Sequence, residues 1–130
     1  MIGAPRSGHV QRRPYNEGRC SVFQVHAFSV QILDLVKDLR QKHETIVSQQ
    51  IGRSGTSIGA NIHEAQFAQS KADFIAKLQI ALKEANETRY WLELLQRSGN
   101  IDAARYQSLD RACASLVALL VASLKTAKSR

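Results

Sequence analysis

Proline is rare in this chain of 130 residues, and it is absent after residue 14, because the only two are Pro5 and Pro14. A proline inside a helix removes a backbone hydrogen bond and clashes with the preceding turn. Its absence leaves residues 15–130 open to helix formation throughout. This favours an all-helical fold.

Cysteine is equally scarce, with only Cys20 and Cys113, far apart in the sequence. Two distant thiols make neither a disulfide framework nor a zinc ligand set. We expect both to be reduced and Cys113 to be a small buried side chain. The four histidines have no metal-like spacing, and the Glu-x-x-His pattern of metal sites in helical bundles is missing. The sequence therefore predicts no metal and no cofactor.

Long apolar runs are missing as well. The opening MIGAPRSGHVQRRPYNEG lacks the apolar centre of a signal peptide. The longest apolar stretch, residues 116–122, is too short to span a bilayer. We therefore expect a cytoplasmic protein with no membrane partner.

Basic residues outnumber acidic ones by seven, and most of the excess lies at the two ends. Residues 1–19 hold four arginines against one glutamate, and residues 125–130 hold three basic residues and no acidic one. Residues 20–124 hold eleven basic residues against ten acidic ones. Basic tails bind nucleic acid by neutralising phosphates, but they also occur on proteins that bind none. Charge alone leaves both alternatives open.

The length fits one domain. Residues 1–20 are rich in glycine, proline and arginine, so we interpret them as a disordered basic arm or as translation from a start codon upstream of the native one. The folded domain is expected to cover residues 21–127, with a basic tail at 128–130.

Apolar residues recur every three or four positions in four segments, which predicts four amphipathic helices. The segments are 22–42, 46–69, a third between Ser70 and Gly99, and 103–127. Thr45, Ser70 with Asp73, and Asp102 are the expected N-caps, and Gly99 is the expected stop of the third helix. Short connections predict an all-α, up-down-up-down antiparallel four-helix bundle. The last segment is apolar on a second side, which indicates burial against another subunit.

The stretch IGRSGTSIGANIHEAQF, residues 51–67, has three glycines in nine positions. It lacks the lysine of a phosphate-binding loop and the second glycine of a dinucleotide-binding motif. Its glycines at 52, 55 and 59 follow helical spacing. We interpret them as a helix face without bulky side chains, which packs closely against the third helix or a neighbouring subunit.

No catalytic constellation is evident. His63-Glu64 resembles the start of a zinc-protease motif, but Phe67 stands where the second histidine belongs. Glu84 and Glu87, three residues apart, are interpreted as solvated charges balanced by Lys83 and Arg89. Asn61 is a poor residue for a helix interior, and we expect it to hydrogen-bond a polar group of the third helix, with Glu87 as the leading candidate.

Three stretches together resemble a known family. The segment from Arg53 to Ala65, RSGTSIGANIHEA, is similar to the signature of four-helix bundle proteins encoded in intervening sequences of bacterial 23S rRNA genes. FIAKLQIAL (74–82) and KEANETRYWLELL (83–95) look like the third helix of that family. The residues that carry this signature and its packing are Ser54, Gly55, Ser57, Ile58, Gly59, Asn61, Ile62, Glu64, Glu87 and Trp91.

The resemblance covers about residues 23–125 and implies a homopentameric barrel. It also implies kinship with the accessory protein of diversity-generating retroelements, which binds nucleic acid and a reverse transcriptase. We therefore expect a non-enzymatic oligomeric scaffold that contacts RNA, DNA or a nucleic-acid-binding protein, with no small-molecule substrate. The alternative is a structural or protein-interaction assembly with no nucleic-acid role. The candidate nucleic-acid contacts are Arg53, Lys71, Lys77, Lys83, Arg89 and Lys125.

Overall fold

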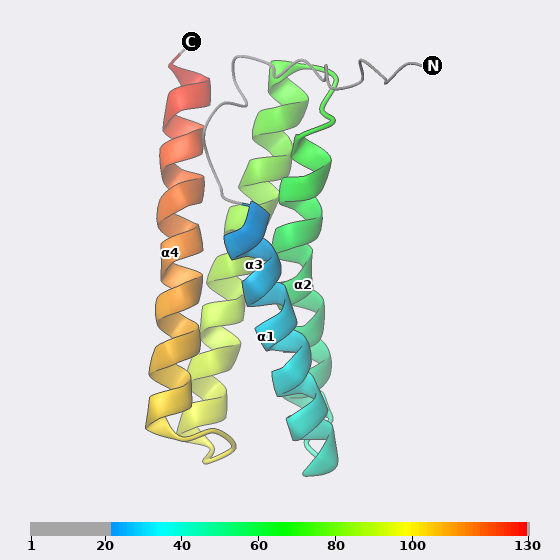
Figure 1. Cartoon of the computed structure of the whole chain (residues 1–130), viewed down its shortest axis with the longest axis vertical. Coiled ribbons are helices and arrows are strands. Elements are labelled where there is room, and N and C mark those ends of the chain that lie inside the picture. Colours follow the sequence, from blue (N-terminus) through cyan, green and yellow to red (C-terminus); the bar gives the residue numbers. More distant parts are fainter. Residues whose placement is uncertain (1–21, 130) are drawn as a thin grey trace, which may run out of the picture.

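The computed structural model describes residues 22–129, which form four α-helices joined by short connections. They are α1 (Val22–Gln41), α2 (Ile46–Ala65), α3 (Lys71–Arg97) and α4 (Ala103–Lys128). Successive helices run in opposite directions, up-down-up-down (Figure 1), and residues 22–129 contain no strand. The predicted all-α antiparallel bundle is confirmed. The expected arm at 1–20 lies outside the described residues.

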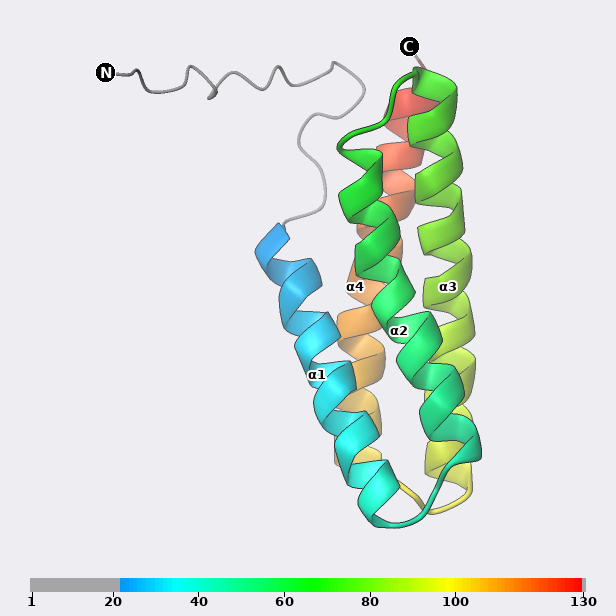
Figure 2. The ribbon, with the colours of Figure 1, turned by 90° about the vertical axis from the view of Figure 1, so that its right-hand side faces the viewer.

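The helices are arranged so that each packs mainly on its neighbours in the sequence. Two of these seams, α2 with α3 and α3 with α4, are extensive, and α1 packs on α2. The contact between α1 and α4 is much smaller, and in Figure 1 α1 is visibly inclined to α4. The side view in Figure 2 shows α1 and α3 on opposite sides of α2. The bundle is therefore least tightly closed between α1 and α4.

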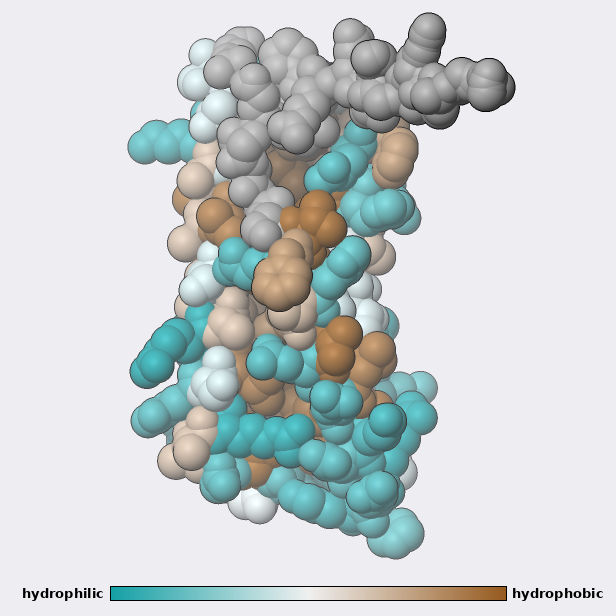
Figure 3. Space-filling model, viewed as in Figure 1, coloured by the Kyte–Doolittle hydropathy of each residue, from teal (hydrophilic) through white to brown (hydrophobic). Residues whose placement is uncertain are grey.

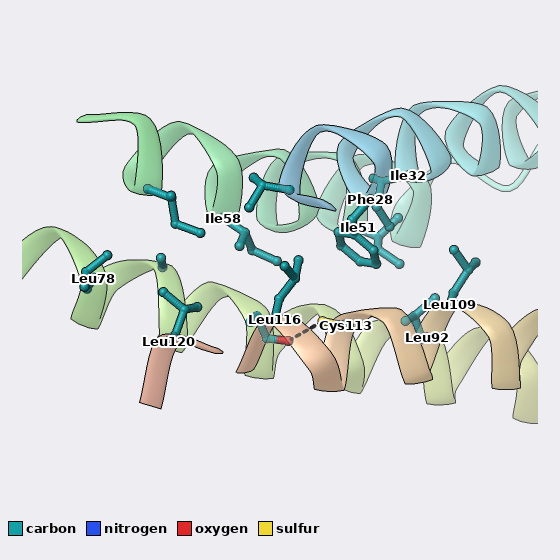
Figure 4. Close-up of a cluster of buried hydrophobic side chains, with 14 of the residues drawn as sticks. Phe28, Ile32, Ile51, Ile58, Leu78, Leu92, Leu109, Cys113, Leu116 and Leu120 are labelled. Carbon is teal, nitrogen blue, oxygen red and sulfur yellow. Dashed lines mark hydrogen bonds between the residues drawn. The ribbon is translucent and has the colours of Figure 1, made fainter. Parts of the chain in front are cut away.

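The core consists of the four apolar stripes that the sequence predicts. Figure 4 shows side chains from all four helices meeting along the bundle axis, among them Ile32, Ile58, Leu92 and Leu116, which are almost completely buried. Burying one such side chain stabilises the fold by about 1.5–3 kcal/mol. Because the stripes repeat every three to four residues, each helix presents one continuous apolar face to the core along its length.

Most of the predicted helix ends are confirmed. The Ser70 hydroxyl accepts a hydrogen bond from the Asp73 amide at 3.0 Å, and Asp102 accepts one from the Arg105 amide at 2.7 Å. Gly99 has a φ of 80°, a left-handed conformation that glycine adopts without strain, just beyond the end of α3.

The start of α2 differs from the prediction. Thr45 occupies the N-cap position, but its side chain makes no cap hydrogen bond. Glu44 replaces it: its two carboxylate oxygens accept from the amides of Val47 and Ser48 at 3.2 and 2.9 Å. The Glu44 side chain, one residue before Thr45 and longer, thus accepts hydrogen bonds from backbone amides in the first turn of α2 that have no partner within the helix.

Helix α2 ends at Ala65, earlier than the predicted residue 69. Residues 66–68 donate to carbonyls three positions back in a tightened last turn. This turn brings Ala68 into the core, where it is 1% exposed. The early end therefore lets the chain reverse direction before Ser70 caps α3.

By length and composition, one helix of the described chain, α4, could cross a membrane, although its longest unbroken apolar run is short. Its core stripe, which includes Leu109, Leu116 and Leu120, is buried against the other helices. Core helices of soluble proteins meet the same criterion, so the observation is weak evidence for a membrane span.

Candidate interaction surfaces

The conspicuous glycines of α2 face α1. A Cβ on Gly55 would stand 2.8 Å from Cγ2 of Ile32, and one on Gly59 would stand 3.1 Å from Cγ1 of Val25. Such distances are too short for real side chains at Gly55 and tight at Gly59. The glycines therefore let α1 and α2 approach closely. The prediction that they pack against the third helix or a neighbouring subunit is wrong.

The other side of α2 packs on α3 through a polar cluster at the surface of the seam. The Arg53 guanidinium contacts carboxylates of both Glu84, at 3.1 Å, and Glu87. The same Glu87 oxygen accepts a hydrogen bond from the Trp91 indole at 2.9 Å. The prediction that Lys83 and Arg89 balance the two glutamates is wrong, because the balancing charge comes from α2.

Beneath this cluster lies a buried pair of hydroxyls. The side-chain oxygens of Ser54 on α2 and Thr88 on α3 are 2.9 Å apart, and both residues are 0% exposed. Thr88 also donates to the Glu84 carbonyl, one turn earlier in its own helix, at 2.8 Å. Buried hydroxyls are stable only when paired, so this contact fixes the register of α2 on α3.

Asn61 takes no part in this cluster. Its side-chain amide donates to the Ser57 carbonyl of its own helix at 2.9 Å, while Glu87 is occupied by Arg53 and Trp91. The predicted contact between Asn61 and Glu87 is therefore wrong. Two other signature residues, Ile58 and Ile62, are in the core, and Glu64 pairs with Lys77 at 3.0 Å. The signature residues of α2 thus pack it against both neighbouring helices, with Gly55 and Gly59 against α1 and Ser54 and Glu64 against α3.

Three of the six candidate nucleic-acid contacts are engaged in ion pairs between helices. Besides Arg53, Lys77 binds Glu64, and Arg89 makes two bonds of 2.8 and 3.0 Å to Asp110 on α4. Lys77 and Arg89 donate hydrogen bonds to the carboxylates of Glu64 and Asp110, and these bonds raise the pKa of both cations. These cations serve the bundle itself.

The remaining candidates are dispersed. Lys83 and Lys125 are exposed and have no ion-pair partner among residues 22–129, whereas Lys71 is half-buried and has a contact of its own. The four candidates on α3 are six residues apart. Because a helix has 3.6 residues per turn, each step of six rotates the direction of the side chain by about one and two-thirds turns about the helix axis. They therefore point in three directions. The structure does not bring them together in one patch.

The described chain offers little for catalysis. Among residues 22–129, no three His, Cys, Asp or Glu side chains come close enough to hold a metal ion. The Cys113 thiol donates to the Ala85 carbonyl at 3.4 Å (Figure 4), and burial raises its pKa to about 12. A neutral buried thiol is a poor nucleophile. His63 lies against Phe67, with ring centroids 5.3 Å apart.

Two hollows flank α1. One, of about 290 Å³, lies in the loose seam with α4 and includes Phe23, Ala27, Ala112 and Ser115 in its wall. The other, of about 300 Å³, lies between the first turns of α1 and the last turns of α2, and includes Val25, His26, Ile62, His63 and Phe67.

Helix α1 carries a second apolar stripe that was not predicted. Phe23, Val30 and Leu33 are 82%, 56% and 53% exposed, whereas the core stripe of the same helix is buried. Figure 3 shows apolar side chains on the front of the molecule, over α1, between polar ones. The signal was present in the sequence, because a helix with apolar residues on two opposite faces is one that needs two partners.

Comparison with known proteins places this geometry in a family. A sequence profile described as 23S rRNA-intervening sequence protein matches residues 22–122. The chain belongs to this family. The match begins with the first residue of α1 and ends within α4, so it covers the α1–α2 and α2–α3 seams just described.

A solved structure agrees with this assignment. The chain is 50% identical to a protein of unknown function from the S23 ribosomal protein family of Bacteroides thetaiotaomicron, over 80% of this chain and 97% of that one. The two structures superpose with a TM-score of 0.79. No curated protein matches significantly. For this 23S rRNA-intervening sequence protein, family membership and fold are therefore established, and its role must be argued from its surface.

Proposed function

We propose that the protein is a non-enzymatic, cytoplasmic subunit of a homo-oligomer, a pentamer, that serves as a scaffold. The observation that carries the assembly is the apolar outer face of α1, where Phe23, Val30 and Leu33 stay at least half exposed in the single chain. Apolar patches of more than a few hundred Å² are rare on monomeric proteins and commonly mark interaction sites. A pentamer is what the family resemblance implies, and a small-molecule substrate has no support in the site geometry.

We further propose that the assembled scaffold contacts nucleic acid or a nucleic-acid-binding partner. The chain carries a net charge of +7, and five copies would combine their fields around one ring. Lys83 and Lys125 remain available for phosphate because neither is engaged by a carboxylate among residues 22–129. Residues 1–19, with four arginines and one glutamate, account for +3 of this net charge.

The alternative is a protein-interaction assembly with no nucleic-acid role. One observation favours it: Arg53, Lys77 and Arg89, half of the candidate phosphate contacts, are neutralised by carboxylates of the same chain. A surface whose cations are already paired attracts phosphate weakly.

The two alternatives are separated by the binding of fluorescent single-stranded RNA to the full chain, followed by anisotropy at 50 and 200 mM salt. A scaffold with six to ten phosphate contacts should lose about 10³–10⁵-fold in affinity over this range. The Lys83→Gln/Lys125→Gln variant should bind more weakly than Lys77→Gln, its matched control. Absence of binding at 50 mM salt, or an affinity that does not fall at 200 mM salt, would support the protein-only alternative. Equal affinity of both variants would show that Lys83 and Lys125 are not the contacts.

A further inference from the structure

The outer face of α1 points away from the bundle. At 3.6 residues per turn, Phe23, Val30 and Leu33 fall within roughly 80° of one another, and Val30 points nearly opposite to Ile32 of the core. All three side chains are at least half exposed, whereas Ile32 is fully buried. Helix α1 therefore has two apolar faces, and only one of them is covered by the described chain.

The size of this face is suited to a protein partner. A whole aromatic side chain covers about 150–250 Å², so Phe23 with the exposed parts of Val30 and Leu33 presents on the order of 300–400 Å² of apolar surface. A standard interface buries about 800 Å² per partner, of which slightly more than half is apolar. The α1 face alone supplies most of that apolar share.

A complementary face lies on α4. Its outer side carries small side chains, Ala114, Ala118 and Ala122, of which Ala118 and Ala122 are exposed, with the larger Val121, 48% exposed, at the margin of this face. Beside the first half of this helix is a shallow hollow of about 390 Å³, with Ser108, Arg111 and other short or polar residues in its wall. Bulky side chains on one helix and small ones on another allow two helices to interlock.

The charges of the two faces also match. Asp34, beside Val30 on α1, is the one carboxylate among residues 22–129 that neither forms an ion pair nor caps a helix. Arg111, on the outer side of α4, is exposed and has no carboxylate partner in the same part of the chain. The two faces thus offer Asp34 and Arg111 as an oppositely charged pair. Each face also carries an exposed cation without a carboxylate partner among residues 22–129, Lys37 on α1 and Lys125 on α4.

The residues of the α1 face and those of the α4 face lie at matching heights along the bundle axis. Within one subunit, Asp38 of α1 and Arg105 of α4 are joined by an ion pair of 2.7 Å, which sets the height of one helix against the other. Because the helices are antiparallel and rise equally per residue, Phe23 lies roughly level with Ala118, and Asp34 roughly level with Arg111. A rotation about an axis along the bundle preserves these levels.

We propose that the outer face of α1 in one copy packs on the outer face of α4 in the next copy, with Asp34 paired to Arg111 of that next copy. The contact joins two different faces, so it generates a ring when the rotation closes. Figure 1 shows that α1 and α4 occupy neighbouring corners of the bundle. Sides of two neighbouring helices that are turned away from the core therefore face in different but not opposite directions. This arrangement favours a closed ring over a straight filament. The proposal rests on the proposed assembly and names its interface.

Sedimentation velocity of the full chain tests the charge pair. Asp34→Arg and Arg111→Asp should each raise the dissociation constant of the assembly at least about tenfold, because each places like charges in contact. Lys83→Asp, an exposed charge reversal on α3, is the matched control and should assemble like the wild type. A one-to-one mixture of the two variants should form heavier assemblies than either variant alone, because each supplies the charge that the other lacks. In a ring of five, alternation of the variants matches four of the five contacts.

The mixture also separates this contact from an ion pair within one chain, since mixing cannot repair an intramolecular clash. Val30→Glu should likewise reduce the assembly while leaving the helical circular dichroism unchanged, and Ile80→Glu on α3 should not. Wild-type mass in Asp34→Arg, Arg111→Asp or Val30→Glu, or a mixture no heavier than its components, overturns this interface and leaves the proposed assembly intact. A wild-type chain that sediments as a monomer overturns both.

Discussion

Gly55 of α2 lies directly against Ile32 of α1, so closely that a Cβ on Gly55 would stand 2.8 Å from Cγ2 of Ile32. Both residues are buried, and the contact lies in the seam between α1 and α2. A glycine inside a helix lowers helix stability by about 1 kcal/mol relative to alanine. At this position, close packing of the two helices compensates for that loss.

Replacing Gly55 with alanine should destabilise the fold although alanine is the better helix former. The added methyl overpacks the seam against Ile32, which typically lowers the free energy of unfolding by about 1–3 kcal/mol. Gly52→Ala is the matched control, because its Cβ would stand 3.3 Å from Val36, a half-buried side chain that can shift. Urea denaturation measures both. Equal stability of the two variants would show that the close approach is unimportant.

Thr88→Val should lower the free energy of unfolding by about 1–3 kcal/mol, because it leaves the buried Ser54 hydroxyl without its partner on α3. The double variant Ser54→Ala/Thr88→Val removes both hydroxyls. It should lose less than the sum of the single changes, and thermal denaturation of all four proteins measures the difference. Additive losses would mean that the two hydroxyls do not interact.

Trp91 is the only tryptophan of the chain, so its fluorescence reports on the cluster around Glu87. Glu87→Ala should shift the emission of the folded protein, because the indole loses its hydrogen-bond acceptor. Glu84→Ala removes a carboxylate that also binds Arg53 but does not contact the indole, and should leave the emission unchanged. Both variants should lose less than about 1 kcal/mol, since Arg53 is half exposed. An unchanged spectrum in Glu87→Ala contradicts the cluster.

Cys113 should resist alkylation by iodoacetamide at pH 8 until the protein unfolds, because burial holds its pKa near 12 instead of 9.0. The folded state thus binds the thiol proton more tightly than the unfolded state. Its contribution to stability is fully present below pH 9 and is lost as the pH rises from 9 to 12. In Cys113→Ala this part of the pH dependence should disappear. Mass spectrometry on a Cys20→Ser background measures the alkylation, and rapid labelling of folded protein would contradict the burial.

The repeating apolar stripes of the four helices made most of the fold predictable. Leu92 and Leu116, for example, belong to stripes with steps of three and four residues, and such stripes form one continuous face only in a helix. Capping chemistry is equally local, so Ser70, Asp102 and Gly99 could be recognised from residues a few positions away. In each case the sequence neighbours that decide the structure are also the neighbours in space.

The partners across helix seams could not be predicted in this way. Helical spacing shows that Gly55 and Gly59 share a face, but not that this face meets α1. In the same way, Arg53 reaches Glu84 and Glu87 only because α2 and α3 pack in one particular register. That register depends on the shapes of both helices. Without the register of α2 on α3, Asn61 was wrongly predicted to hydrogen-bond a residue of α3.

We propose that the protein works as a homo-oligomeric scaffold, and the mass of the full chain in solution shows whether copies of the chain assemble. Light scattering coupled to size exclusion, at micromolar concentration and moderate salt, should give five times the chain mass of 14.5 kDa. A particle with the mass of one chain under the same conditions would contradict the account.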